Sequence, residues 1–189
     1  MSVDQSVDGD GNKVVAGDNI ETHLHFNPAS RVSQMKRLIE LYHEEQKNGG
    51  SAFSGFIKKI QHYQSNVEED QLIGLEAKLR AAGLPHDISW AKRLKENYAK
   101  MLTESELSRA AQEIHAYLLA KVLTHFNNAV LPAINEGQSE SVIKELVLHR
   151  VIVPVEAELE TPVLDIYSED INAMIYFLTG NCHINWTRS

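Results

Sequence analysis

Residues 103–137 read TESELSRAAQEIHAYLLAKVLTHFNNAVLPAINEG, and this stretch decides the fold class. Its apolar residues recur every three or four positions, the spacing that places them on one face of an α-helix. The face continues for roughly seven turns. A helix this long needs neighbours to cover its apolar face, and the stretch therefore predicts a helical bundle. The residues of the face are Leu107, Ala110, Ala111, Ile114, Tyr117, Leu118, Val122, Phe126 and Val130.

The ends of this helix are also marked in the sequence. Thr103 and Glu106 have the spacing of a capping box, in which each side chain satisfies a backbone N–H of the first turn. Pro132 lacks a backbone N–H, so it should kink or end the helix. Gly137 is the expected stop signal.

Six further helical segments are expected around this helix, which makes the protein mainly α, with about seven helices. Glycine and proline separate several of them, as at Gly83 and Pro85. The β-branched run 151–155 leaves helix and strand in competition, and Gly180-Asn181 is a typical helix end. The expected segments are 28–48, 53–63, 68–82, 88–102, 139–151 and 169–178. The expected core residues are Leu75, Leu79, Leu94, Ile114, Leu118, Val122, Phe126, Ile143, Ile175, Phe177 and Leu178.

A different composition precedes the helices. Up to Asn27-Pro28, glycine, asparagine and aspartate alternate with short apolar runs, which predicts a glycine-rich β arm over residues 1–27 and a helical domain over residues 28–189. Two or three such strands cannot stand alone in water. We favour pairing with other copies or with another protein, over packing on the chain's own helices, because the arm has little apolar surface. The residues expected to pair are Val14, Val15, Ile20, Leu24 and Phe26.

Two histidines of the arm suggest an alternative. His23 and His25 alternate along one strand and share a face. Two imidazoles are too few for a zinc site, but three arms in a trimer would bring six together around a metal. The competing interpretation is that both histidines lie on the solvent face of an edge strand.

Charge and composition exclude several classes of protein. The formal net charge of −8 argues against a duplex-DNA or anionic-membrane binder. The densest basic groups, Lys58-Lys59 and Lys92-Arg93-x-Lys95, are interpreted as solvated helix faces. No apolar run approaches a membrane span, and the single cysteine cannot form an internal disulfide. These features predict a cytoplasmic protein.

No catalytic constellation stands out, and no cofactor is implied. Cys182-His183 invites a thiol-hydrolase interpretation. Neighbours on an extended segment point to opposite faces, however, so they would not form a dyad. A buried structural cysteine is favoured. His115, beside Ile114, is expected to be a partly buried helix residue rather than a base. No P-loop, GxGxxG or GxSxG motif occurs.

The helical part carries several runs that belong together. The most specific is Leu178-Thr179-Gly180-Asn181-Cys182-His183-Ile184-x-Trp186. With the other runs, it resembles the C-terminal domain of prokaryotic ABC-three-component systems over roughly residues 51–186. The arm's Gly9-Asp10-Gly11-Asn12 is similar to a segment of several bacterial conflict proteins. The other runs are Phe56-Ile57-x-x-Ile60-x-x-Tyr63, Gly74-Leu75-Glu76-x-Lys78-Leu79, Ala91-x-x-Leu94-Lys95-Glu96, Ala120-Lys121-Val122-x-x-x-Phe126 and Pro132-x-Ile134.

The resemblance implies a role in defence against phage or plasmids. Such systems combine an SMC-like ABC ATPase, a middle component and an effector, whose toxic domain usually precedes the domain seen here. Only the short arm precedes it in this chain, so the usual protease or nuclease is missing and the expected role is that of the C-terminal docking domain. The family supplies no catalytic residues to carry over.

The sequence therefore predicts a non-enzymatic assembly and docking component that oligomerises through its arm, with a trimer as one form. Its expected partners are the ABC ATPase and the middle component, and nucleic acid is reached only through them. Two alternatives stay open: a small hydrolase or effector using Cys182 or His183, and a metal-dependent arm assembly using His23 and His25.

Overall fold

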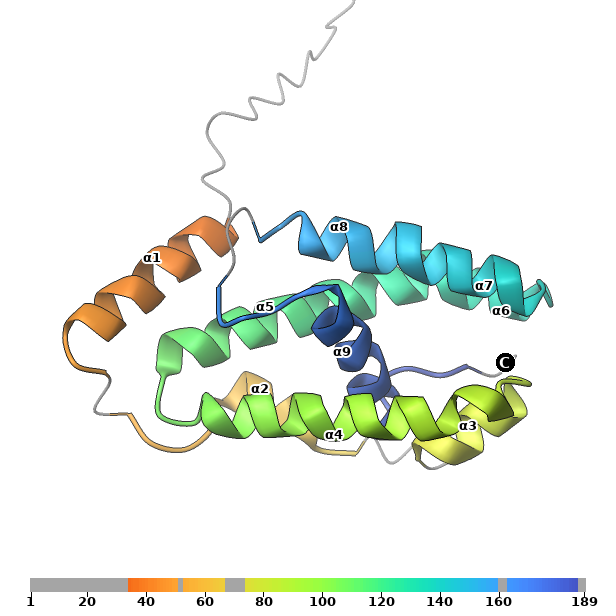
Figure 1. The fold of residues 1–189 in the computed structure, drawn as a ribbon, viewed down its shortest axis with the longest axis horizontal. Helices are drawn as coiled ribbons and strands as arrows, with labels where there is room; N and C mark the ends of the chain where they lie inside the picture. The colour runs from red at the N-terminus through yellow and green to blue at the C-terminus, as the bar shows by residue number, and fades with distance from the viewer. Residues whose placement is uncertain (1–33, 51–52, 67–73, 160–162, 187–189) are drawn as a thin grey trace, which may run out of the picture. The chain divides into compact units, whose positions relative to one another are not determined.

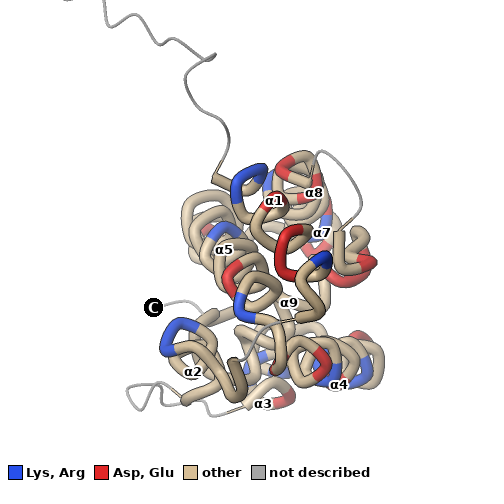
Figure 2. The backbone as a smooth tube through the Cα atoms, turned by 90° about the vertical axis from the view of Figure 1, so that its left-hand side faces the viewer, with Lys and Arg blue, Asp and Glu red and all other residues tan. Residues whose placement is uncertain are grey.

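The computed structural model describes residues 34–50, 53–66, 74–159 and 163–186, and the regular secondary structure within these ranges is all helical (Figure 1 and Figure 2). Three short turns complete the helices: η2 (Pro85–Asp87), a 3₁₀ turn, and η3 (Phe126–Val130) and η4 (Val147–Ile152), both π-helical. The α-helices are α1 (Gln34–Lys47), α2 (Lys58–Gln64), α3 (Leu75–Ala81), α4 (Ile88–Glu104), α5 (Arg109–His125), α6 (Leu131–Asn135), α7 (Glu140–Leu146), α8 (Val153–Glu156) and α9 (Ser168–Gly180).

The predicted mainly helical fold is confirmed. Because η3 and η4 join their neighbours without a break, the described residues form seven continuous helical stretches. The predicted β arm, with its pairing residues and histidines, lies outside the described residues, as does the expected domain border. None of the helices in the described part of the chain is long and apolar enough to cross a membrane.

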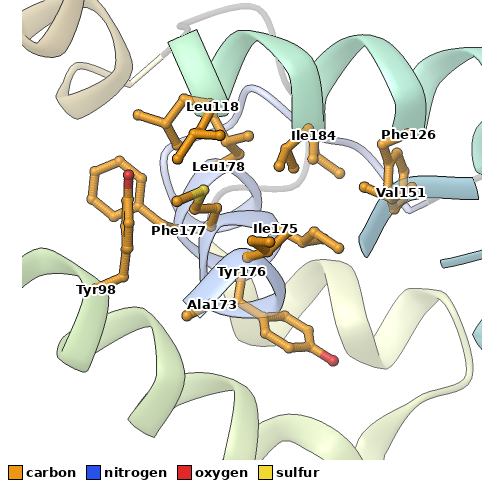
Figure 3. Close-up of a cluster of buried hydrophobic side chains, with 14 of the residues drawn as sticks. Tyr98, Leu118, Phe126, Val151, Ala173, Ile175, Tyr176, Phe177, Leu178 and Ile184 are labelled. Atoms are coloured by element: carbon orange, nitrogen blue, oxygen red, sulfur yellow. The ribbon is translucent and has the colours of Figure 1, made fainter. Parts of the chain in front are cut away.

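Helix α9 is the centre of the bundle. Its residues Ala173 to Gly180 are all buried, and a helix that is apolar all round belongs in a core. It packs most extensively on α4, and also on α3, α5 and α8. In Figure 3, Phe177 faces Tyr98 of α4, while Leu178 lies toward Leu118 of α5. All of the core residues predicted from the sequence are buried, which confirms the apolar faces.

Prolines are accommodated inside two helices. Pro132 does not end the long helix, which continues through α6 to Asn135. A proline cannot donate to the carbonyl four residues earlier, and its ring clashes with it. The π turns η3 and η4 directly precede the helical turns that hold Pro132 and Pro154, so the backbone is already wider there. The β-branched run 151–155 is helical, because packing overrides local propensity.

The start of α5 differs from the prediction. The expected capping box is wrong, because α4 continues through Glu104 and the Thr103 hydroxyl donates instead to the carbonyl of Ala99, at 3.0 Å. The cap is Ser108, whose hydroxyl accepts from the backbone N–H of Ala111 at 3.1 Å. Leu107 therefore precedes the helix, and it is 67% exposed instead of facing the core.

The end of α9 also differs. Gly180 was expected in the helix cap, but it is the last helical residue, and Cys182 takes the left-handed conformation with φ of +63°. The backbone N–H of His183 donates to the carbonyl of Leu178 at 2.8 Å and closes the cap. A Cβ at Gly180 would lie 2.5 Å from Nζ of Lys95, so the end of that flexible side chain would have to move to admit one.

Candidate partner-docking groove

The C-terminal run after α9 is used in packing. The Thr179 hydroxyl donates to the carbonyl of Ile175 at 2.7 Å and accepts from the indole N–H of Trp186 at 2.8 Å. The Trp186 ring meets Phe126 edge-on, with ring centroids 4.9 Å apart, and lies nearly parallel to Tyr176. The indole ring and its only donor therefore both have partners in the core.

A buried lysine fixes the chain beyond α9. Lys78 of α3 has no exposed surface, and its Nζ donates to the carbonyl of Ile184 at 3.0 Å. A buried ammonium needs such acceptors to offset its desolvation. The C-terminal run is thus tied to α3 as well as to α9.

Two polar residues of the same run reach α2. The side-chain amide of Asn181 donates to the carbonyl of Tyr63 at 2.9 Å, and Nε2 of His183 donates to the carbonyl of Ser65 at 3.1 Å. The His183 ring also meets the rings of His62 and Tyr63, with centroids 5.0 and 5.4 Å away. Burial, and then the nearby His62, lower the pKa of His183, which favours its neutral form. The run therefore holds the end of α2.

Gln112 of α5 holds the start of α2. Its Oε1 accepts from the backbone N–H of Ile57 at 2.8 Å, and its Nε2 donates to the carbonyl of Gly55 at 2.8 Å. These bonds keep residues 53–57 out of the helix, together with Gly55, whose φ is +99°. The predicted helix over 53–63 is therefore wrong in its first turn. Tied at both ends, α2 is ordered although seven residues are too few for a stable isolated helix.

A hydrogen bond to Glu45 fixes α1 on α5. The carboxylate of Glu45 accepts from the backbone N–H of Ala110 at 2.9 Å, so it sits at the N-terminus of α5. A negative charge is favourable there, because the first N–H groups of a helix lack intrahelical partners. Helices α1 and α2 are thus both fixed on α5.

An open groove of about 680 Å³ lies between α1, α2 and α5. We call it the docking groove. Its floor is apolar and made of small or aliphatic side chains, including Ala116 and Ala120 of α5. Its rim is polar and mostly basic, and Figure 2 shows the blue lysine segment on α2. The lining residues are Gln34, Leu38, Lys58, Lys59, His62, Tyr63, Glu113, Ala116, Tyr117, Ala120, Lys121, Thr124 and His125.

Two carboxylates each pair with one lysine of this rim. Lys59 lies 3.8 Å from Glu113, across the groove, with 68% of its side chain exposed. Lys121 donates to Glu158 at 2.6 Å, and this hydrogen bond raises the pKa of Lys121. Glu158 also accepts from the Tyr117 hydroxyl at 2.9 Å. Two of the three lysines of the rim, Lys59 and Lys121, are therefore paired with carboxylates.

The arrangement of Cys182 and His183 does not suit a nucleophile and its base. Cys182 is 7% exposed and its backbone sits in the left-handed region, while the His183 ring faces α2. Within the described ranges, no hydrogen bond joins the Cys182 thiol to an imidazole. Cys182 is the buried cysteine that the sequence suggested.

His115 is more deeply buried than expected. It has no exposed surface, and its ring nitrogens lie 3.2 Å from the hydroxyls of Tyr98 and Ser105. Burial lowers the pKa of His115 to about 4. In the part of the chain that the structure describes, no group of three or more histidine, cysteine, aspartate or glutamate side chains could hold a metal ion. His23 and His25 lie outside that part.

The basic rim was missed as a site in the sequence, where Lys58-Lys59 read as a solvated face. Lys58 and Lys59 are exposed, but they face α5 residues that follow more than fifty positions later. No local pattern brings α1, α2 and α5 together. Gln112 stands between Ala111 and Glu113, so no local pattern marks its amide as one that is buried and needs partners.

Comparison with known proteins identifies the domain. The model of C-terminal domain 9 of the ABC-three component (ABC-3C) systems matches residues 74–186, which contain α3 to α9 and the C-terminal run. No curated protein and no solved structure matches the chain. Since the match covers more than half of the sequence, the chain belongs to the family of C-terminal domain 9 of the ABC-three component systems.

Proposed function

We propose that this protein is a non-enzymatic assembly and docking component of a bacterial ABC-three-component system that acts against phage or plasmids. Its partners are an SMC-like ABC ATPase and a middle component, and it contacts nucleic acid only through them. It works in the cytoplasm and needs no cofactor. Membership of the family supports the choice of partners.

One observation carries the docking role. The polar side chains of the family run, such as Thr179, Asn181 and His183, are bonded to other parts of the protein rather than turned toward a substrate. Asn181 and His183 thereby hold α2 beside an open groove. An open groove whose Lys59 and Lys121 are paired with Glu113 and Glu158 favours a binding module over an enzyme.

Co-expression tests this function. The full chain is produced with the ABC ATPase and the middle component of its own system, and light scattering coupled to size exclusion measures the mass of what elutes. We expect a complex that contains this chain. Elution of the chain apart from both proteins, at micromolar concentrations, would contradict the docking role.

We assign separate roles to the arm and to the helical domain. Residues 1–27 set the oligomeric state through Val14, Val15, Ile20, Leu24 and Phe26, and residues 28–189 dock. The alternation of apolar and polar residues in the arm supports this. In the full chain, Ile20→Asp with Leu24→Asp should give a smaller species by light scattering. An unchanged mass would remove the arm from the assembly.

The two alternative functions have direct tests. A catalytic Cys182 would react quickly with a mild thiol reagent in the native protein, whereas a buried thiol reacts only on unfolding. We expect the slow reaction, because Cys182 is buried. For the arm metal site, His23→Ala with His25→Ala would change both metal content, by elemental analysis, and the oligomeric mass if a metal holds the arms.

A further inference from the structure

We propose that the docking groove between α1, α2 and α5 binds an acidic segment of the partner protein. This inference rests on the docking function proposed above and names the surface that performs it. The occupant is one chain segment of another protein, with carboxylates that meet the basic rim and apolar side chains that meet the floor.

The dimensions of the groove fit a chain segment. Its α5 wall runs from Glu113 to His125, which is about 18 Å at 1.5 Å per residue. Three turns of a helix, or five to six residues of extended chain, cover about this length. A volume of about 680 Å³ accepts several side chains at once.

The floor can bury apolar side chains. Leu38 of α1 and Ala116 and Ala120 of α5 lie along it, and Ala120 is exposed. Small side chains let another backbone approach α5 closely, because interaxial distances depend on the side chains at the contact.

The charge of the rim selects an acidic occupant. Lys58, Lys59 and Lys121 line the groove, against Glu113 beside Lys59 and Glu158 bonded to Lys121, so the rim keeps an excess of positive charge. This basic rim lies on a chain whose net charge is −8. Long-range repulsion from that net charge opposes a nucleic acid duplex more than a short acidic segment, which carries fewer charges and can lie close to the rim lysines.

The groove is also prepared for binding before a partner arrives. Gln112 and Asn181 fix the two ends of α2, and Glu45 fixes α1 on α5. Binding to a preformed wall avoids the entropy cost of ordering it. The basic residues of α2 are thus already presented toward the groove.

Charge reversal tests the rim. The variant Lys58→Glu with Lys59→Glu should weaken the complex with the ABC ATPase and middle component by at least about tenfold, less so at high salt. Glutamate in the first turn of α2 is favourable for the helix, so the fold should persist, which circular dichroism checks. The matched control is Arg93→Glu with Lys100→Glu, two exposed residues of α4 outside the groove. Equal weakening in both variants, or none in the first, overturns the groove proposal.

Crosslinking tests the occupant. A photoreactive amino acid at Thr124, on the exposed side of the groove, is activated in the complex, and mass spectrometry identifies the attached peptide. We expect an acidic segment of the ATPase or the middle component. A crosslink to residues 1–33 of this chain, to a second copy, or to a segment without acidic residues overturns the proposal. If the wild-type chain forms no complex at all, the docking function is contradicted. If the wild-type chain forms the complex and the groove variant binds equally well, the docking function stands and the groove proposal is wrong.

Discussion

The side-chain amide of Asn181 donates a hydrogen bond to the backbone carbonyl of Tyr63 at 2.9 Å. The two residues are separated by 118 positions, and they join the chain beyond α9 to the last turn of α2. The last carbonyls of a helix have no intrahelical partner, so this bond satisfies one of them. The family run therefore acts on α2, and through α2 on the docking groove.

Substitution of Asn181 tests this connection. Asn181→Ala removes the donor and should lower the free energy of unfolding by about 1 kcal/mol. Amide hydrogen exchange should become faster in α2, while exchange in the centre of α9 changes little. Asn128→Ala, at an exposed position in η3, is the matched control. Unchanged exchange in α2 would mean that other contacts hold the helix.

Gln112 should contribute more than Asn181, because it makes several bonds. Besides Ile57 and Gly55, its Nε2 lies within hydrogen-bonding distance of the carbonyls of Ser105 and Glu106, at 3.2 and 3.0 Å. Gln112→Ala leaves these groups unpaired, and we expect a loss of about 2–4 kcal/mol in the free energy of unfolding. Gln112→Glu keeps an acceptor for Ile57 but loses the donor, so it should be no more stable than alanine. A loss below about 1 kcal/mol in urea titrations would contradict this account.

The apolar faces of the long helices were predictable, because they depend on a local period. Ile114, Leu118, Val122 and Phe126 recur at helical spacing, and each is buried as expected. Membership of the family was also predictable, because the C-terminal run is recognisable from its own sequence. These features need no knowledge of which helix lies beside which.

The predictions that were wrong concern features that depend on contacts between residues far apart in the sequence. Ser108 replaces Thr103 as the cap because α4 extends past its predicted end. The start of α2 moves to Lys58 because Gln112, 55 residues away from Ile57, takes the backbone bonds of the preceding turn. The groove could not be predicted for the same reason: its walls come from separate segments.

Cys182 gives a test of backbone strain. Its φ of +63° is a conformation that side chains branched at Cβ rarely adopt. Cys182→Val should therefore lower the free energy of unfolding by about 2 kcal/mol or more. Cys182→Gly relaxes the backbone but loses the buried thiol, so its stability should stay close to wild type. Urea denaturation gives the free energy of unfolding of the three proteins. A Cys182→Val variant as stable as Cys182→Gly would refute the argument.

His115 sits in a network that suits a neutral ring. The Ser105 hydroxyl donates to the carbonyl of Met101 at 3.1 Å, which uses its only proton. Nε2 of His115 therefore donates to the Ser105 oxygen, and Nδ1 accepts from the Tyr98 hydroxyl. Both ring nitrogens are satisfied without a charge. Burial also raises the pKa of Tyr98, so its hydroxyl keeps the proton that it donates.

Acid should therefore destabilise the fold through His115. The pKa of its imidazole is 6.5 in the unfolded chain and about 4 in the fold, so between these values the unfolded chain binds the extra proton. The contribution to stability is complete above pH 6.5 and is lost as the pH falls toward 4, up to about 3 kcal/mol in all and about 2 kcal/mol at pH 5. Other titrating groups act in parallel, so the comparison is with His115→Gln, whose side chain stays neutral. Urea titrations at pH 7 and pH 5 should show a fall in unfolding free energy about 2 kcal/mol smaller in that variant than in wild type. His149→Gln, at an exposed position, should leave the fall unchanged, and an equal pH dependence in all three proteins would show that folding does not lower the pKa of His115.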